Sequence, residues 1–216
     1  SSLIQLNPAI KFMMIETPSM VPHHIVQKHL DAKFPVWSMF DKLRTLTEII
    51  NDKTELLYLR PESTTGTYTM FEQLFPQDAQ FRKLLPLCLW QVGSSFRIEQ
   101  DKAFSNLRFK QFYQMEFQIA YAENTKADYH AASVTSIKSI LEVLFGFKVS
   151  QECLCGNDVP FYSNKTTYMH VEQIEGGKHE VVAISSRNDF KVPILEVSVG
   201  LDRLIYLYLS AYNSMS

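Results

Sequence analysis

The stretch FRIEQDKAFSNLRFKQFYQMEFQ, residues 96–118, decides the fold, because it contains the ends of two β-strands and the loop between them. Polar and apolar side chains alternate over residues 111–121, which predicts a strand with one polar face and one buried face. The apolar run at residues 87–97 predicts the strand that leads into the loop. Together these segments predict a β-hairpin with a polar connection.

The side chains of this hairpin suit a site for a nucleotide and a small zwitterion. Arg97 and Glu99 fall on one face of the first strand. Phe112 and Glu116 fall on one face of the second strand, and Arg108 lies in the loop. An arginine binds phosphate through two parallel hydrogen bonds, a phenylalanine stacks on a purine, and a glutamate facing a cavity holds an ammonium group. Each residue taken alone is more often a surface ion pair or a core side chain, so their combination favours the nucleotide site.

The rest of the sequence predicts one α+β domain. Apolar residues make up 46% and charged residues 20% of the 216 residues, which is ordinary for a globular domain. Strands dominate the middle of the chain and are joined by hairpin-length segments. This favours an antiparallel β-sheet flanked by helices, in a single domain over residues 1–216. Besides the hairpin, strands are predicted at residues 12–15, 55–60, 168–174, 180–185 and 194–199, and helices at residues 25–30, 40–50, 67–74, 125–145 and 201–212.

Charge, motifs and cysteine spacing argue against several kinds of site. The net charge of -2 gives no overall basic field, so any nucleic-acid contact must come from a local patch. No G-x-G-x-x-G or P-loop sequence is present. Cys88, Cys153 and Cys155 are predicted to be reduced thiols of a cytoplasmic protein rather than a zinc site, because no second closely spaced pair exists. No apolar run reaches the length of a membrane span, so no membrane partner is expected.

Five segments, in the same order as in the family, resemble the catalytic core of the class II aminoacyl-tRNA synthetases, and within that class they are most similar to glycyl-tRNA synthetase. Residues 96–116 resemble motif two, and the resemblance as a whole covers roughly residues 12–210. The other matching segments are LYLRPESTTG at residues 57–66 (family pattern L-R-P-E-T-A-Q-G), LPLCLWQVGSS at residues 85–95, EVVAISSRNDF at residues 180–190, and EVSVGLDR at residues 196–203 (family pattern E-P-S-x-G-x-D-R). The sequence departs from the glycyl patterns after Glu62 and at Val197, which stands in place of proline.

The resemblance implies a role for each matching residue. Arg97 and Arg203 are implied to be catalytic, Arg97 at the α-phosphate and Arg203 against the adenine and the γ-phosphate. Three carboxylates around one ammonium group would select an α-amine and leave little room for a side chain. The implied ATP-binding residues are Arg97, Glu99, Arg108, Phe112 and Arg203, and the implied amino-acid-binding residues are Glu62, Glu116, Glu196 and Ser198. Glu196 is also the implied ligand of Mg²⁺, a hard cation that prefers oxygen ligands.

The resemblance implies ATP-dependent activation of glycine, or of another small amino acid, as an aminoacyl-AMP. The acceptor would be either a tRNA 3' end or a non-tRNA acceptor, such as a carrier protein or a modified nucleotide. The alternative is a non-catalytic paralogue that acts as a nucleic-acid-binding or accessory subunit. The family's motif-one helix and anticodon-binding domain have no counterpart in the sequence, which leaves a homodimer as a possibility only.

Overall fold

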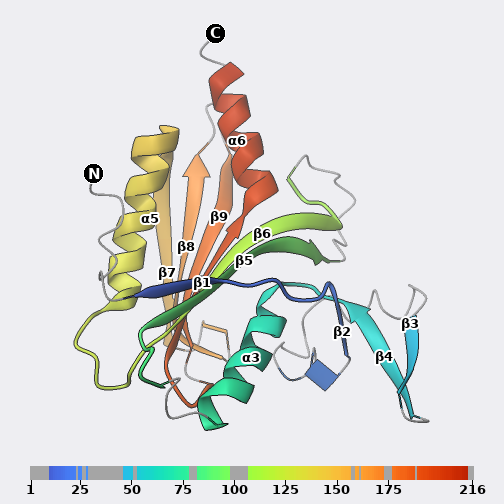
Figure 1. The fold of residues 1–216 in the computed structure, drawn as a ribbon. Coiled ribbons are helices and arrows are strands. Elements are labelled where there is room, and N and C mark those ends of the chain that lie inside the picture. The colour runs from blue at the N-terminus through green and yellow to red at the C-terminus, as the bar shows by residue number, and fades with distance from the viewer. Residues whose placement is uncertain are drawn as a thin grey trace.

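A seven-stranded β-sheet forms the centre of this computed structural model, in the order β1-β5-β6-β10-β9-β8-β7 (Figure 1). The structure describes residues 10–22, 24–25, 28, 46–50, 53–77, 82–97, 107–156, 159–160, 162–172, 177–187 and 189–213. All neighbouring strands of this sheet are antiparallel except β1 and β5, which are parallel. The strands are β1 (Lys11–Met14), β5 (Leu87–Phe96), β6 (Gln111–Ala120), β10 (Ile194–Gly200), β9 (Lys178–Arg187), β8 (Ser163–Glu172) and β7 (Lys148–Cys155). The predicted α+β fold with an antiparallel sheet is confirmed, with one parallel pair at its edge.

In the described part of the chain, three helices cover the two faces of this sheet. Helices α5 (Tyr129–Phe145) and α6 (Leu201–Asn213) pack on one face, where the larger apolar core lies. Helix α3 (Thr64–Gln77) packs on the other face through Tyr68 and Phe71, over a smaller core. Figure 1 shows α5 and α6 together on one side of the sheet and α3 on the other. Of the described helices, none is long and apolar enough to cross a membrane.

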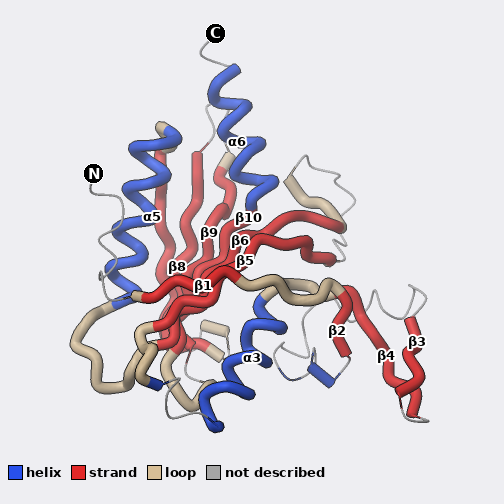
Figure 2. The backbone as a smooth tube through the Cα atoms, in the orientation of Figure 1, coloured by secondary structure: helices blue, strands red, loops and turns tan. Residues whose placement is uncertain are grey.

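A second, three-stranded sheet lies beside α3 (Figure 2). Its order is β2-β4-β3, formed by β2 (Met20–Pro22), β4 (Lys53–Leu59) and β3 (Leu46–Ile50). The helix predicted over residues 40–50 is therefore wrong for residues 46–50. Their apolar spacing fits a helix, but each residue from 46 to 50 pairs with β4 in antiparallel register. Residues 40–45 lie outside the described part, as do most of residues 25–30.

The hairpin predicted from residues 87–121 is confirmed as β5 and β6, which pair from Leu87 with Ala120 to Phe96 with Gln111. The burial of the two faces of β6 differs from the prediction. Gln114, Glu116 and Gln118 are buried, whereas Tyr113 on the other face is 51% exposed. The polar face is buried because it points toward α3 and the loops that follow β4, so it faces the interior of the protein.

The remaining predicted elements are confirmed with small shifts in their ends. Helix α5 begins at Tyr129 rather than at residue 125, because the side chain of Asp128 caps it by accepting a hydrogen bond from the Ala131 backbone N–H. The helix ends at Gly146, which has a φ of 68°. Strand β7 was not predicted. Most of its residues are exposed, and an exposed strand does not need alternating apolar and polar residues. The pattern that marks a half-buried strand is therefore missing from its sequence.

Candidate active site

A cavity of about 310 Å³ lies against the polar face of the sheet. It brings together residues from β6, β8, β9, β10 and the start of α6, and Arg97 directly after β5, which are far apart in the sequence. Of the residues predicted to form a site, the cavity is lined by Glu62, Arg97, Arg108, Phe112, Glu196, Ser198 and Arg203. Glu116 lies behind Ser198 rather than in the wall, and Glu99 lies outside the described residues.

Glu116 is the most deeply buried of the predicted carboxylates. Its side chain has no exposed surface, and it accepts hydrogen bonds from Ser63 at one oxygen and from Ser198 at the other, the latter at 3.3 Å. Burial, followed by the negative charge of Glu62, raises the pKa of Glu116 to about 8. Without a ligand, this carboxyl group therefore carries a proton for much of the time near neutral pH.

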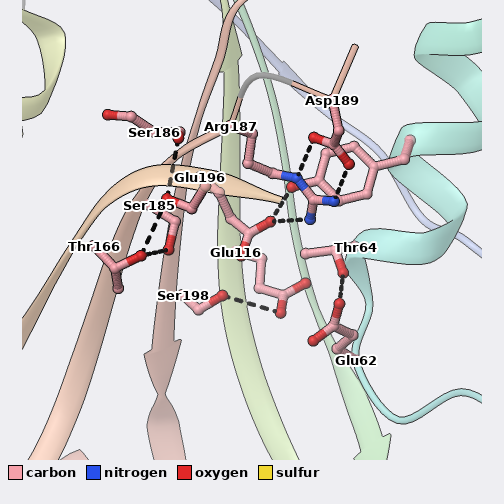
Figure 3. A network of polar contacts seen from close by, with 12 residues as sticks. Glu62, Thr64, Glu116, Thr166, Ser185, Ser186, Arg187, Asp189, Glu196 and Ser198 are labelled. Carbon is pink, nitrogen blue, oxygen red and sulfur yellow. Dashed lines mark hydrogen bonds and ion pairs between the residues drawn. The ribbon is translucent and has the colours of Figure 1, made fainter. Parts of the chain in front are cut away.

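The carboxylate of Glu62 has two partners, a neutral hydroxyl group and a positively charged guanidinium group. Thr64 donates a hydrogen bond to one carboxylate oxygen, and the Arg97 guanidinium lies 3.7 Å from the other. Burial, followed by the charge of Glu196, raises the pKa of Glu62, while the charge of Arg97 lowers it. The Glu62 carboxylate thus connects the acidic part of the cavity to an arginine. Figure 3 shows each carboxylate with its own partner, which is Thr64 for Glu62, Ser198 for Glu116 and Arg187 for Glu196.

Glu196 is held by Arg187 and Tyr68, two residues to which the sequence analysis assigned no role. Tyr68 donates a hydrogen bond to the Glu196 carboxylate, and Arg187 pairs with the same oxygen at 3.1 Å. Arg187 also pairs with both oxygens of Asp189, at 2.7 Å and 3.1 Å. The rings of Tyr68 and Tyr162 each lie 4.2 Å from the Arg187 guanidinium carbon. The R-x-D-F sequence at residues 187–190 was the signal that could have identified this support.

Two arginines of the cavity, Arg97 and Arg108, are more exposed than Glu62 and Glu196. Arg97 donates to the backbone oxygen of Pro61 at 3.0 Å, and its guanidinium lies 5.2 Å from the centre of the Phe112 ring. Arg203 donates to the backbone oxygen of Leu107 at 3.3 Å and 3.4 Å, and Arg108 is exposed. Backbone carbonyl groups are neutral acceptors, so the positive charges of these arginines are not cancelled by those bonds.

A buried polar chain fixes the loop that carries Ser63. Arg60 donates to the backbone and hydroxyl oxygens of Thr17, and the Thr17 hydroxyl donates to Gln91 at 2.8 Å. The Gln91 amide then donates to the backbone oxygen of Ser63 at 2.8 Å. Arg60 also explains Gly93, because a Cβ atom at that position would lie 2.1 Å from the Arg60 guanidinium. Arg60, Thr17 and Gln91 each have hydrogen-bond partners in this series, so the series holds the Ser63 loop in one position.

The arrangement can hold a small cation and an extended anion side by side. Glu62 and Glu196 in the cavity wall, with Glu116 behind Ser198, can neutralise an ammonium group, and the three arginines can neutralise phosphate oxygens. The described residues contain no group of three or more histidine, cysteine, aspartate or glutamate side chains that could hold a metal ion. A single carboxylate such as Glu196 still fits Mg²⁺, because this ion is often bound by one or two carboxylates together with substrate phosphates.

Comparisons with known proteins give one family and a consistent set of relatives. The family described as tRNA synthetase class II core domain (G, H, P, S and T) matches residues 47–200. A glycine–tRNA ligase of Malacoplasma penetrans is 26% identical over 205 residues, which cover 81% of this chain and 42% of that protein. A glycine–tRNA ligase of Mycoplasmopsis synoviae is 32% identical over 97 residues, which cover 43% of this chain and 21% of that protein. The chain thus spans less than half the length of these curated relatives.

A solved structure shares the fold. The prolyl-tRNA synthetase of Giardia lamblia, in complex with prolyl-adenylate, matches with a TM-score of 0.68 and 17% sequence identity. The match covers 92% of this chain and 42% of that chain. The similarity extends over nearly the whole chain, so both the large sheet and the elements around the cavity belong to the shared fold.

Proposed function

The chain belongs to the class II tRNA synthetase core family, and from this premise we propose that it activates a small amino acid, glycine by preference, with ATP. The product is an aminoacyl-adenylate, which then passes to an acceptor. The observation that carries the proposal is that one cavity is lined by the half-buried Glu62 and the buried Glu196 together with Arg97, Arg108 and Arg203. The glycine–tRNA ligase relatives support the choice of amino acid, and the shared fold supports the class of reaction.

The proposed reaction needs orientation and charge neutralisation rather than a protein nucleophile. An oxygen of the amino-acid carboxylate attacks the α-phosphorus of ATP, a new O–P bond forms, and the bond to the leaving pyrophosphate breaks. Arg97 stabilises the negative charge that develops on the α-phosphate oxygens, and Arg203 binds the adenine and the outer phosphate. Glu196 is the proposed protein ligand for Mg²⁺, which neutralises phosphate charge when bound.

The amino-acid end of the cavity favours a small substrate with an α-amine. Glu62, Glu116 and Glu196 are proposed to surround the ammonium group, with Ser198 beside it. Tyr162 lines the cavity, with its ring 4.2 Å from the Arg187 guanidinium carbon, and we propose that it limits the space for a substrate side chain. Excluding a larger substrate by shape is easier for a protein than rejecting a smaller one, so glycine is the preferred substrate.

Pyrophosphate exchange into ATP tests the first step with each amino acid in turn. We expect exchange with glycine, weaker exchange with alanine or serine, and none with large amino acids. The absence of exchange with all three small amino acids would refute the proposal and favour the non-catalytic paralogue. A second measurement, transfer of radiolabelled glycine into tRNA, protein and DNA fractions, separates a tRNA acceptor from a carrier protein or a modified nucleotide. We propose that the reaction takes place in the cytoplasm.

A further inference from the structure

Cys153 and Cys155 lie two residues apart on β7, which is an edge strand of the seven-stranded sheet. Both side chains are exposed thiols. Successive side chains of a strand point to opposite faces, so residues at positions i and i+2 point to the same face. The two thiols therefore stand next to each other on one accessible surface.

The pair lies apart from the cavity described above. In the register of β7 and β8, Cys153 pairs with Thr167 and Cys155 pairs with Lys165. The Thr167 hydroxyl lies 2.8 Å from a ring nitrogen of His130, near the start of α5, so this face of the strand pair is the one that α5 covers. Figure 1 shows β7 beside α5, at the far edge of the sheet from α3. Neither cysteine lines the cavity.

Strand geometry favours a bridging atom over a direct disulfide between the two thiols. A strand rises about 3.3 Å per residue, which places the two Cβ atoms about 6.6 Å apart, whereas a disulfide needs Cβ atoms about 3.5–4.5 Å apart. Two metal–sulfur bonds of about 2.3 Å each allow the sulfur atoms to be up to about 4.6 Å apart. An ion between the thiols therefore fits a strand that keeps its regular pairing.

We propose that Cys153 and Cys155 form a two-thiolate site for a soft ion of low coordination number, such as Cu(I). Soft thiolate ligands select Cu(I), whereas a structural zinc ion takes four ligands. Among the described residues no third metal-binding side chain joins the pair, which matches a two-coordinate ion. Two S–H bonds break as two metal–sulfur bonds form, so each bound Cu(I) releases two protons to solvent. Lys165, directly across from Cys155, offsets the negative charge of the resulting complex.

A competition titration with a chromophoric Cu(I) chelator tests the site in the reduced full chain. We expect one Cu(I) per chain, held more weakly as the pH falls because binding releases protons. Cys153→Ser and Cys155→Ser should each weaken binding by about 100-fold, the lower end of the gain expected from two linked ligands. Cys88→Ala is the matched control, because Cys88 is fully buried and its loss should leave the affinity unchanged.

Two results would overturn the proposal. One is an unchanged Cu(I) affinity in both single-cysteine variants, which would locate the binding at other side chains. The other is binding of two Cu(I) ions per chain with equal affinity at Cys153 and Cys155, which would mean that the thiols act separately. Neither measurement requires ATP or an amino acid, so both are independent of the proposed adenylate formation. A thermal unfolding scan of each variant confirms that the fold is retained.

Discussion

Glu62, Glu116 and Glu196 each accept hydrogen bonds from side chains of the protein, whereas Arg97 and Arg203, which line the same cavity, donate to backbone carbonyl groups. Glu116 has no exposed surface and is bound by Ser63 and Ser198, while the Arg97 side chain is 28% exposed and donates to a backbone carbonyl. We call Glu62, Glu116 and Glu196 the carboxylate cluster, and Arg97, Arg108 and Arg203 the arginine set. The cluster is held by hydrogen bonds before a ligand arrives, and we propose that the arginine set moves toward the ligand when it binds.

This difference suits the sizes of the two proposed substrates. A small amino acid offers few contacts, so its binding energy depends on groups that are already in place. A nucleotide triphosphate is large and carries several charges, so its total binding energy is large. The cost of ordering the side chains that move to reach it is therefore a smaller fraction of that energy. The comparison therefore predicts that changes in the arginine set affect the reaction rate, and changes in the carboxylate cluster affect amino-acid affinity.

The largest expected effect is that of Arg97→Ala on the rate of pyrophosphate exchange. Arg97 is proposed to neutralise charge that develops in the transition state, so its removal should lower the exchange rate by about 10²–10³-fold. Initial-rate measurements at saturating ATP and glycine separate this loss from weaker binding. Arg97→Lys is the matched control, and it should recover part of the rate because it keeps the charge but not the bidentate geometry. An unchanged rate in Arg97→Ala would remove Arg97 from the reaction.

The next largest effect is expected for Glu116→Gln, which should lower the affinity for glycine and raise the stability of the fold. Removing a charged partner of the ammonium group should weaken glycine binding by about 10–100-fold, measured by calorimetry. Glutamine mimics the protonated acid, so the same variant should be more stable than the original protein at pH 8. Each kcal/mol gained should raise the melting temperature by about 2–4 °C for a chain of this size.

The pH dependence of this effect follows from the pKa of Glu116. Its pKa is raised to about 8 in the fold from an ordinary value of 4.5, so the folded state favours the protonated form. The resulting stability is fully present below pH 4.5 and is lost as the pH rises through 8. The original protein should therefore lose more stability than Glu116→Gln between pH 5 and pH 8.5. Equal losses in both proteins would mean that Glu116 is already ionised in the fold.

The sequence predicts the chemistry of the carboxylate cluster better than its burial. The alternation over residues 111–121 identified a strand and the polar face that carries Glu116. It could not tell which face points into the protein, because a polar face over a cavity and a polar face toward solvent have the same pattern. The structure buries Gln114 and Gln118 and leaves Tyr113 exposed.

Apart from Arg187, the residues that support the site could not be predicted because they act across long separations in the chain. Thr17 and Gln91 form a buried hydrogen bond 74 residues apart, and Tyr68 reaches Glu196 across 128 residues. Neither pair is marked by local spacing in the sequence, since threonine and tyrosine are common in helices and strands of every kind. The pairing of β1 with β5 brings Thr17 near Gln91, and the packing of α3 against the sheet brings Tyr68 to Glu196.

The smallest expected effect tests whether the carboxylate cluster and the arginine set act separately. Glu62 belongs to the carboxylate cluster and links it to the arginine set, because it pairs with Arg97 at 3.7 Å. Its other oxygen accepts a hydrogen bond from Thr64. A bound ammonium group would neutralise Glu62 and weaken its attraction for Arg97, which would then be free to bind a phosphate. We therefore expect glycine and a non-hydrolysable ATP analogue to raise each other's affinity by about fivefold.

Calorimetric titrations of each ligand, with and without the other, measure this coupling in both directions. The two factors must be equal, because coupling between binding equilibria is reciprocal. Glu62→Gln should reduce both factors to about one, since glutamine carries no charge to share between the two ligands. Thr64→Val is the informative control, because it removes the hydrogen bond to Glu62 but keeps the charge, so the coupling should persist. Coupling that survives in Glu62→Gln would have to pass through other groups of the cavity, and the two sets of residues would then be joined more widely than this single ion pair.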